Sequence, residues 1–225
     1  MQLDFASPFA DHGGVSSFRS LLGAAPRTVF TVWVAAIAVL TAVTAAVVAA
    51  RGALPAEVEV IRWFQGFGRP VPALATAVHA VTGTEANLVV GFVPALWLIR
   101  RRGRRGAAAA VICLAAMLFV QPVSKEIVDR DRPTELEVDV RAEHSSRSYP
   151  SGHSLSTTVV WGVAAGVAST ADRSRWAYWL CVPILATALA GVILGVHWPT
   201  DAIAGTIVGA VAAALAVRTL SRATT

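Results

Sequence analysis

Residues 148–156 read SYPSGHSLS and lead into an apolar stretch without charged residues that runs to Thr170. Free N–H groups at a helix N-terminus bind anions, and a glycine lets a ligand approach the backbone closely. Ser151 adds a hydroxyl donor next to Gly152, and His153 follows in the first predicted turn. The pattern indicates an anion site at the start of an apolar helix. The alternative is that Ser151 only caps the helix and His153 hydrogen-bonds to interfacial water.

The whole chain shares this apolar character. Of 225 residues, 55% are hydrophobic and 15% are charged, and the mean hydropathy is +0.60. A soluble domain carries about 25% charged residues, so this composition indicates a membrane protein. A helix that spans the membrane needs about 20 consecutive apolar residues. The stretches long enough to span are 29–50, 82–99, 106–124, 151–170, 176–196 and 202–217. We therefore predict an all-α polytopic membrane helix bundle with six transmembrane helices.

Charged residues predict how this bundle is oriented. Residues 100–106 read RRRGRRG, and positively charged loops stay on the cytoplasmic side. With six spans, both termini are then cytoplasmic, and the acidic loop from Glu126 to Pro150 faces outward. The predicted organisation is a leader over 1–28, a six-span domain over 29–217 and a tail over 218–225.

The remaining composition narrows the function. The net charge of +5 lies in short loops between predicted spans, so it reports topology and we expect no nucleic-acid partner. Cys113 and Cys181 both fall inside predicted spans, so no disulfide framework is implied. Residues 51–81, broken by prolines, are expected to form amphipathic helices at the outer membrane interface.

A second polar segment, KEIVDRDRP, covers residues 125–133. Lys125 is the only lysine in the chain. The spacing predicts a helix from Gly106 to Arg132 that Pro133 ends, with Lys125 and Arg132 two turns apart on one face. The alternative is a solvated helix end with snorkelling cations.

The third polar segment, GVHWPTDAIAG, covers residues 195–205. Its predicted helix end at His197 precedes a new helix that begins near Pro199. A carboxylate four residues on, Asp201, can hold the proton of one imidazole nitrogen and aim the other outward as a nucleophile. The alternative is a capping aspartate beside an interfacial histidine.

On the predicted topology these three helix ends lie on the same membrane face. Together they supply two cations, backbone N–H donors, two histidines and a carboxylate. This combination suits a highly charged oxyanion, which at a membrane surface is the phosphate of a lipid.

At these positions the sequence resembles the type 2 phosphatidic acid phosphatase family, whose membrane members have six spans. The family signatures are Lys, six residues, Arg-Pro; then Pro-Ser-Gly-His; then Ser-Arg, five residues, His, three residues, Asp. This chain carries Lys125 with Arg132-Pro133, Pro150 to His153, and His197 with Asp201. The resemblance covers residues 106–217.

One signature position departs from the family. Ala190-Gly191 stands where the family has Ser-Arg. The family arginine contacts the phosphate, so the resemblance implies a site that lacks one cation unless Arg141 or Arg147 replaces it.

The resemblance also implies a role for each residue. His197 is the nucleophile that becomes a phosphohistidine, Asp201 orients it, and His153 protonates the leaving oxygen and then activates water. The groups expected to bind the phosphate are Lys125, Arg132, Ser151 and the Gly152 N–H. No metal or other cofactor is expected.

We therefore expect a multi-pass cell-membrane phosphatase that hydrolyses a lipid phosphate or pyrophosphate at the extracytoplasmic face. Its expected partners are the bilayer and a lipid phosphate substrate. The sequence leaves the lipid and the oligomeric state open. A catalytically weakened lipid-phosphate-binding protein is the alternative, because of Gly191. A transporter is disfavoured because no charges lie at mid-span.

Overall fold

The computed structural model describes residues 26–142, 144–170 and 174–221, which are entirely helical apart from turns and loops. The all-α prediction is confirmed. In chain order the helices are α2 (Pro26–Ala50), α3 (Glu57–Gln65), α4 (Pro70–Val81), α5 (Thr84–Arg102), α6 (Arg104–Ala115), the π-helical segment η1 (Ala116–Val120), α7 (Gln121–Val128), α8 (Gly152–Thr170), α9 (Ser174–Ile193) and α10 (Pro199–Ser221).

The ends of the predicted leader and tail lie outside the described residues. Of the leader over 1–28, only residues 26–28 are described, in the first turn of α2. Of the tail over 218–225, residues 218–221 continue α10.

Three of the described helical segments are long and apolar enough to cross a membrane: Arg104–Val128, Trp176–Ile193 and Pro199–Ser221. The pair α4 and α5 would add a fourth as one broken span, with a bend of 56°. Three or four segments of the described structure thus support a transmembrane bundle, and the number of six spans remains a prediction.

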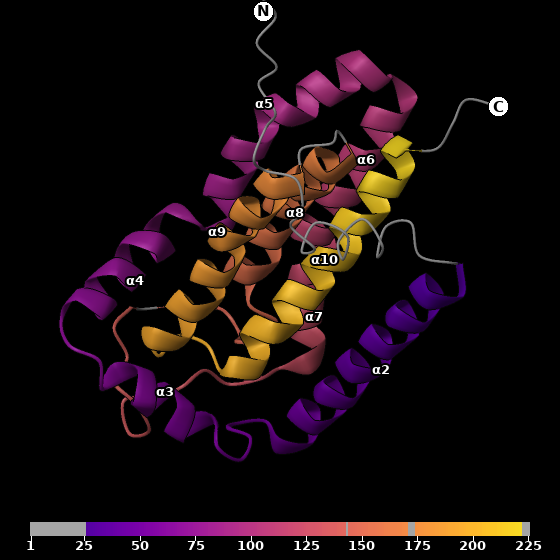
Figure 1. Ribbon diagram of the computed structural model, residues 1–225. Helices are drawn as coiled ribbons and strands as arrows, with labels where there is room; N and C mark the ends of the chain where they lie inside the picture. Colours follow the sequence, from indigo (N-terminus) through magenta and orange to yellow (C-terminus); the bar gives the residue numbers. More distant parts are fainter. Residues whose placement is uncertain (1–25, 143, 171–173, 222–225) are drawn as a thin grey trace, which may run out of the picture.

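Helices α8 and α10 pack closely at the centre of the bundle, with α9 beside α8 (Figure 1). A Cβ atom at Gly205 would lie 2.4 Å from the carbonyl oxygen of Ser151, so only glycine allows this approach. The Ser151 N–H also donates to the Asp201 carbonyl oxygen at 3.0 Å. These contacts bring the first turn of α8 against the first turn of α10, where two of the predicted motifs begin.

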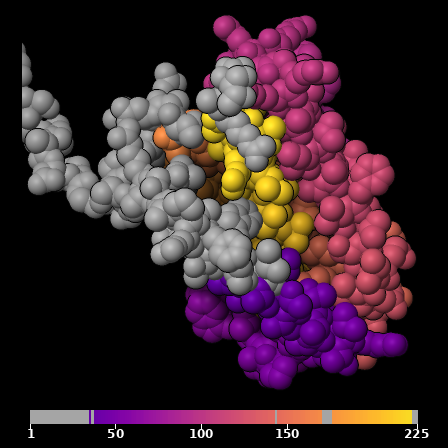
Figure 2. Space-filling model, turned by 90° about the vertical axis from the view of Figure 1, so that its right-hand side faces the viewer, coloured from indigo at the N-terminus to yellow at the C-terminus, as the bar shows by residue number. Residues whose placement is uncertain are grey.

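Helix α6 and the amino-terminal helices cover the rest of α10. Ala109 of α6 packs against Ala216 and Leu220 near the end of α10. Val47 of α2 packs on Ala204, and the space-filling view shows α10 flanked by α6 and α7 with the α2–α3 region beneath (Figure 2). Helices α3 and α4 lie at the end where α10 begins, so they cover the region of the polar motifs (Figure 1).

The helix expected to reach Arg132 ends at Val128 instead. Asp129 adopts a left-handed conformation, with φ of 49°, and its N–H donates to the Lys125 carbonyl oxygen at 3.0 Å. The following residues lie outside any helix, and their side chains alternate. Arg130 is buried and Arg132 half-buried, whereas Asp129 and Asp131 are exposed. Because the helix ends early, both Arg130 and Arg132 point inward, whereas the sequence predicted this only for Arg132.

Candidate active site

His197 lies at the centre of the polar cluster, in the turn between α9 and α10, and is 1% exposed. Its Nε2 atom is 3.4 Å from Nη1 of Arg132. Its Nδ1 atom is 3.6 Å from Oδ2 of Asp201 and 3.5 Å from the hydroxyl of Ser148. The distance to Asp201 is longer than a hydrogen bond. One ring nitrogen thus faces a carboxylate and the other faces a cation.

Burial lowers the pKa of His197 to about 3, although the nearby Asp201 carboxylate acts in the opposite direction. The imidazole is therefore neutral at pH 7. A neutral ring has a lone pair on one nitrogen, which is the form that a nucleophile requires.

Asp201 is completely buried and receives donors on both carboxylate oxygens. Its Oδ2 accepts from the Ser148 hydroxyl at 2.5 Å and from the Trp198 N–H at 2.9 Å. Its Oδ1 accepts from Nη1 of Arg130 at 2.6 Å. Sequence reasoning missed Ser148 and Arg130. The nearest signal for Arg130 was its place two residues before Arg132.

Lys125 and Arg132 both bond to the segment at residues 146–147, and do not share a helix face as the sequence predicted, because α7 ends at Val128. The Lys125 ammonium donates to the Ser146 hydroxyl at 3.0 Å and to the Arg147 carbonyl oxygen at 2.5 Å. Arg132 donates to the carbonyl oxygens of Ser146 at 2.7 Å and Val196 at 2.5 Å. Burial lowers the pKa of Arg132 to about 10, so the side chain stays charged at neutral pH. Two cations therefore converge beside His197.

His153 belongs to a group of four histidines. Its ring stacks on His79 of α4, with centroids 3.8 Å apart and an interplanar angle of 11°. Nε2 of His79 is 3.2 Å from Nε2 of His144. The His144 ring lies 6.1 Å from that of His153 and 6.5 Å from that of His197. His79 and His144 were not predicted, and no motif marked them.

Burial, with smaller contributions from nearby charges, lowers the pKa of His144 to about 4. Its side chain is only partly buried, and at this pKa the imidazole is neutral at pH 7.

The start of α8 is less open to an anion than its sequence suggested. The Ser151 hydroxyl accepts from the Ser154 N–H at 3.3 Å, so it caps the helix as in the alternative interpretation. The Ser151 N–H is occupied by Asp201. A Cβ at Gly152 would lie 2.8 Å from Nε2 of Gln121, so a larger residue there requires the end of the Gln121 side chain to move.

The arginines considered as replacements at position 191 differ in their placement. The Arg147 guanidinium pairs with Asp129 at 2.6 Å and with Asp131. Arg141 pairs with Asp139 at 2.7 Å and lines a cavity of about 960 Å³. That cavity is also lined by Arg132, His144 and Val196. Arg141 thus shares a cavity with the site, whereas the Arg147 side chain is held by two exposed carboxylates.

Within the described residues, no group of three or more His, Cys, Asp or Glu side chains is placed to hold a metal ion. Among those residues, the cations of the site are supplied by Lys125 and the neighbouring arginines.

Comparisons with known proteins agree with the sequence motifs. The sequence model of the PAP2 superfamily matches residues 106–225. An undecaprenyl-diphosphatase of Sulfolobus acidocaldarius is 31% identical over 120 residues, which are 52% of this chain and 56% of that protein. A decaprenylphosphoryl-5-phosphoribose phosphatase of Mycolicibacterium smegmatis is 36% identical over 107 residues, which are 47% of this chain and 53% of that protein. The chain thus spans about half the length of these two relatives.

The fold also has a counterpart among solved structures. A transmembrane PAP2-type phosphatidylglycerolphosphate phosphatase from Bacillus subtilis superimposes with a TM-score of 0.69 and 20% sequence identity. The match covers 81% of this chain and 92% of the other. At this identity the likeness concerns the fold.

Proposed function

This chain belongs to the PAP2 superfamily, and we propose that it is an integral-membrane phosphatase acting on a lipid phosphomonoester or diphosphate. The observation that carries the proposal is the environment of His197. Its Nε2 faces the Arg132 guanidinium, where a phosphate would bind, and its Nδ1 faces Asp201. A nucleophile held between a cation and an orienting carboxylate suits phosphoryl transfer.

In the proposed reaction, Nε2 of His197 attacks phosphorus and the bond from phosphorus to the leaving oxygen breaks. His153 protonates that oxygen. Asp201 stabilises the positive charge that develops on the His197 ring. Water then attacks the phosphohistidine, His153 takes the proton of this water, and phosphate leaves. Lys125 and Arg132 stabilise the negative charge on the transferring group, the function of metal ions in many phosphatases.

The donors proposed for α8 are the two that the sequence indicated. The Gly152 N–H and the hydroxyl hydrogen of Ser151 remain the proposed donors at this helix start, because the Ser151 N–H is already bonded.

The proposed substrate is a lipid whose phosphate lies at the membrane surface. The two relatives named above are called an undecaprenyl-diphosphatase and a decaprenylphosphoryl-5-phosphoribose phosphatase, and both names refer to a phosphorylated polyprenyl compound. We extend this class, a polyprenyl phosphate or diphosphate, to the present chain. A lipid-phosphate-binding protein with weak activity is the second candidate, because Gly191 leaves the site without the family arginine.

Phosphate release tests the proposal directly. The purified protein in detergent with EDTA is expected to release phosphate from a short polyprenyl diphosphate or from phosphatidic acid. The reaction needs no metal because Lys125 and Arg132 supply the positive charge. Tight substrate binding without release would favour the second candidate, and activity that appears only after a divalent metal is added would contradict the proposed chemistry.

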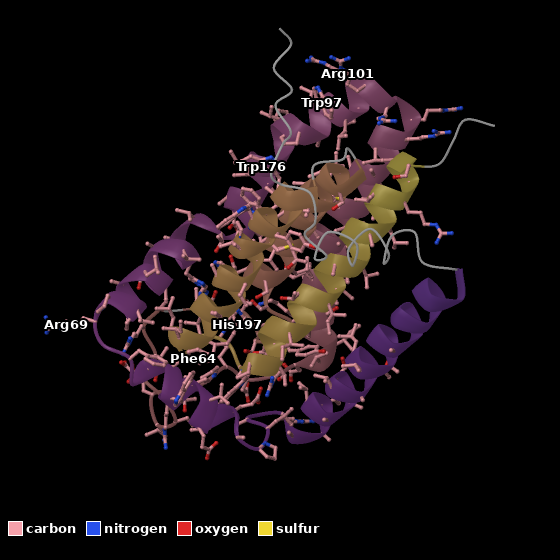
Figure 3. All side chains as sticks on the ribbon, viewed as in Figure 1. Phe64, Arg69, Trp97, Arg101, Trp176 and His197 are labelled. Carbon is pink, nitrogen blue, oxygen red and sulfur yellow. The ribbon has the colours of Figure 1, made fainter. Side chains whose placement is uncertain are left out.

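We also propose that the site faces outward. His197 and Arg101 lie toward opposite ends of the bundle, which supports a site on the side away from the arginine-rich turn (Figure 3). In a background without Cys113 and Cys181, Leu136→Cys is expected to react with an impermeant thiol reagent on intact cells, because Leu136 is 94% exposed. Arg101→Cys, which is also exposed, is expected to react only after permeabilisation. The reverse pattern would place the site in the cytoplasm.

A further inference from the structure

A buried group of three charged side chains lies directly behind Asp201. Arg130 is placed between two carboxylates, and its Nη1 is 2.6 Å from Oδ1 of Asp201. Its Nη2 bonds to Oε2 of Glu57, which belongs to α3. The side chains of Arg130 and Asp201 are fully buried and that of Glu57 is 5% exposed. The group connects an amino-terminal helix to the proposed catalytic turn.

The remaining polar atoms of this group are also paired. Oε1 of Glu57 accepts from Thr200, from its N–H at 3.1 Å and its hydroxyl at 2.7 Å. Arg130 donates to the Gly52 carbonyl oxygen from Nε at 3.1 Å and from Nη2 at 2.9 Å. Its guanidinium also lies over the Trp198 ring, 5.4 Å from the centroid. A guanidinium held at this many points has a fixed orientation.

That orientation fixes the rotation of the Asp201 carboxylate. With Oδ1 bound to Arg130, the other oxygen, Oδ2, faces Ser148 and His197. A carboxylate held in this way can keep the imidazole in one tautomer, with its proton on Nδ1 and its lone pair on Nε2.

Glu57 affects the charge that Asp201 presents. Two carboxylates share one guanidinium, so the group carries one net negative charge. Without the charge of Glu57, Arg130 would neutralise Asp201 alone. Less negative charge would then face the His197 ring when that ring becomes positive. At short range inside a protein such charge differences are weakly screened.

We propose that Glu57 and Arg130 are positioning residues for His197 that act through Asp201. Arg130 sets the orientation of the carboxylate, and Glu57 preserves its negative charge. This inference rests on the proposed phosphohistidine chemistry, and it adds a residue of α3, outside the matched region 106–225, to the function of the site.

The test compares two glutamates in the first turn of α3. Glu57→Gln removes the buried charge and keeps the side-chain length, whereas Glu59→Gln makes the same change at an exposed position. We expect Glu57→Gln to lower the kcat for a short polyprenyl diphosphate about tenfold, less than the 10²–10³-fold typical of a direct donor. The KM of Glu57→Gln is expected to stay within about twofold of wild type, because Glu57 does not touch the substrate. Glu59→Gln is expected to match wild type, because Glu59 is exposed and lies outside the buried group.

Glu57→Asp separates charge from shape. Asp keeps the charge but is one methylene shorter, whereas Gln keeps the length without the charge. The proposal predicts a higher kcat for Glu57→Asp than for Glu57→Gln. A purely steric role for Glu57 predicts the opposite order and would overturn the proposal. Thermal unfolding of each variant shows whether it is folded. If one of the two Glu57 variants fails to fold, the kcat of the other is compared with that of Glu59→Gln.

A readout independent of turnover completes the experiment. In protein labelled with ¹⁵N-histidine, the Nδ1 resonance of His197 is assigned by its absence in His197→Ala. We expect this resonance to move in Glu57→Gln and to stay in place in Glu59→Gln. If wild type releases phosphate but neither kcat nor the resonance responds to Glu57→Gln, the inference is refuted. If the resonance moves while wild type forms no phosphoenzyme, the proposed function fails and the electrostatic coupling stands.

Discussion

Replacing His197 by alanine is expected to abolish turnover and to remove the acid-labile phosphoenzyme. The loss in kcat should be on the order of 10⁴-fold or more, because without the nucleophile the remaining groups can only bind and polarise the phosphate. Rapid mixing with radiolabelled substrate, followed by alkaline quench, measures the phosphoenzyme directly, since a phosphohistidine survives base and is lost in acid.

His153→Ala is the matched comparison, since it removes the other histidine of the proposed mechanism. A general acid is needed least when the leaving group is good. This variant should therefore still form phosphoenzyme from p-nitrophenyl phosphate while its turnover of a lipid phosphate slows about 10²–10⁴-fold. Full activity in His197→Ala would rule out its assignment as nucleophile. Normal lipid turnover in His153→Ala would remove this residue from the proton-transfer steps.

The candidate residues could be identified from sequence because each of their motifs is local. Pro150 to His153 mark the start of α8, and His197 lies in the turn directly before α10, whose first turn carries Asp201. Lys125 and Arg132 converge even though the helix between them ends early. Their meeting therefore depends on the loop over 146–147, which the sequence did not reveal.

The residues that sequence reasoning missed depend on distant segments. Glu57 and Arg130 are 73 positions apart, and each taken alone is an ordinary charged residue near a loop. His79 and His144 are 65 positions apart, and neither belongs to a motif. Because hydropathy and spacing report on near neighbours along the chain, pairs of this kind become visible only when the helices are packed.

Arg132 is expected to carry more of the catalytic effect here than it would in a site that retains the family arginine. Its Nη1 is the cationic atom 3.4 Å from Nε2 of His197, and Gly191 offers no side chain. Arg132→Ala should therefore lower kcat/KM by about 10²–10³-fold, the cost of losing one positioned donor to the transition state. Steady-state kinetics on a lipid phosphate measures this loss.

Arg147→Ala is the control for Arg132→Ala. This arginine lies in the same loop between α7 and α8, but its guanidinium pairs with Asp129 and Asp131, so a change below about threefold is expected for a pair at the surface. Arg141→Ala should have an intermediate effect if its charge reaches a phosphate bound in the cavity that it shares with Arg132. A large loss of activity in Arg147→Ala with none in Arg132→Ala would mean that Arg147, and not Arg132, supplies the main positive charge to the phosphate.

Gly191→Arg tests whether the missing cation limits the enzyme. A Cβ at this position would lie 3.5 Å from Cδ2 of His197, an ordinary contact, so an arginine there begins beside His197 without a backbone clash. The φ angle of Gly191 is not positive, so a side chain at this position adds no backbone strain. We expect Gly191→Arg to raise kcat/KM and to restore part of the activity lost in Arg132→Ala, because transition-state stabilisation grows with the number of aligned donors. A folded Gly191→Arg variant that improves neither background would mean that Lys125 and Arg132 already meet the charge of the transferring phosphoryl group.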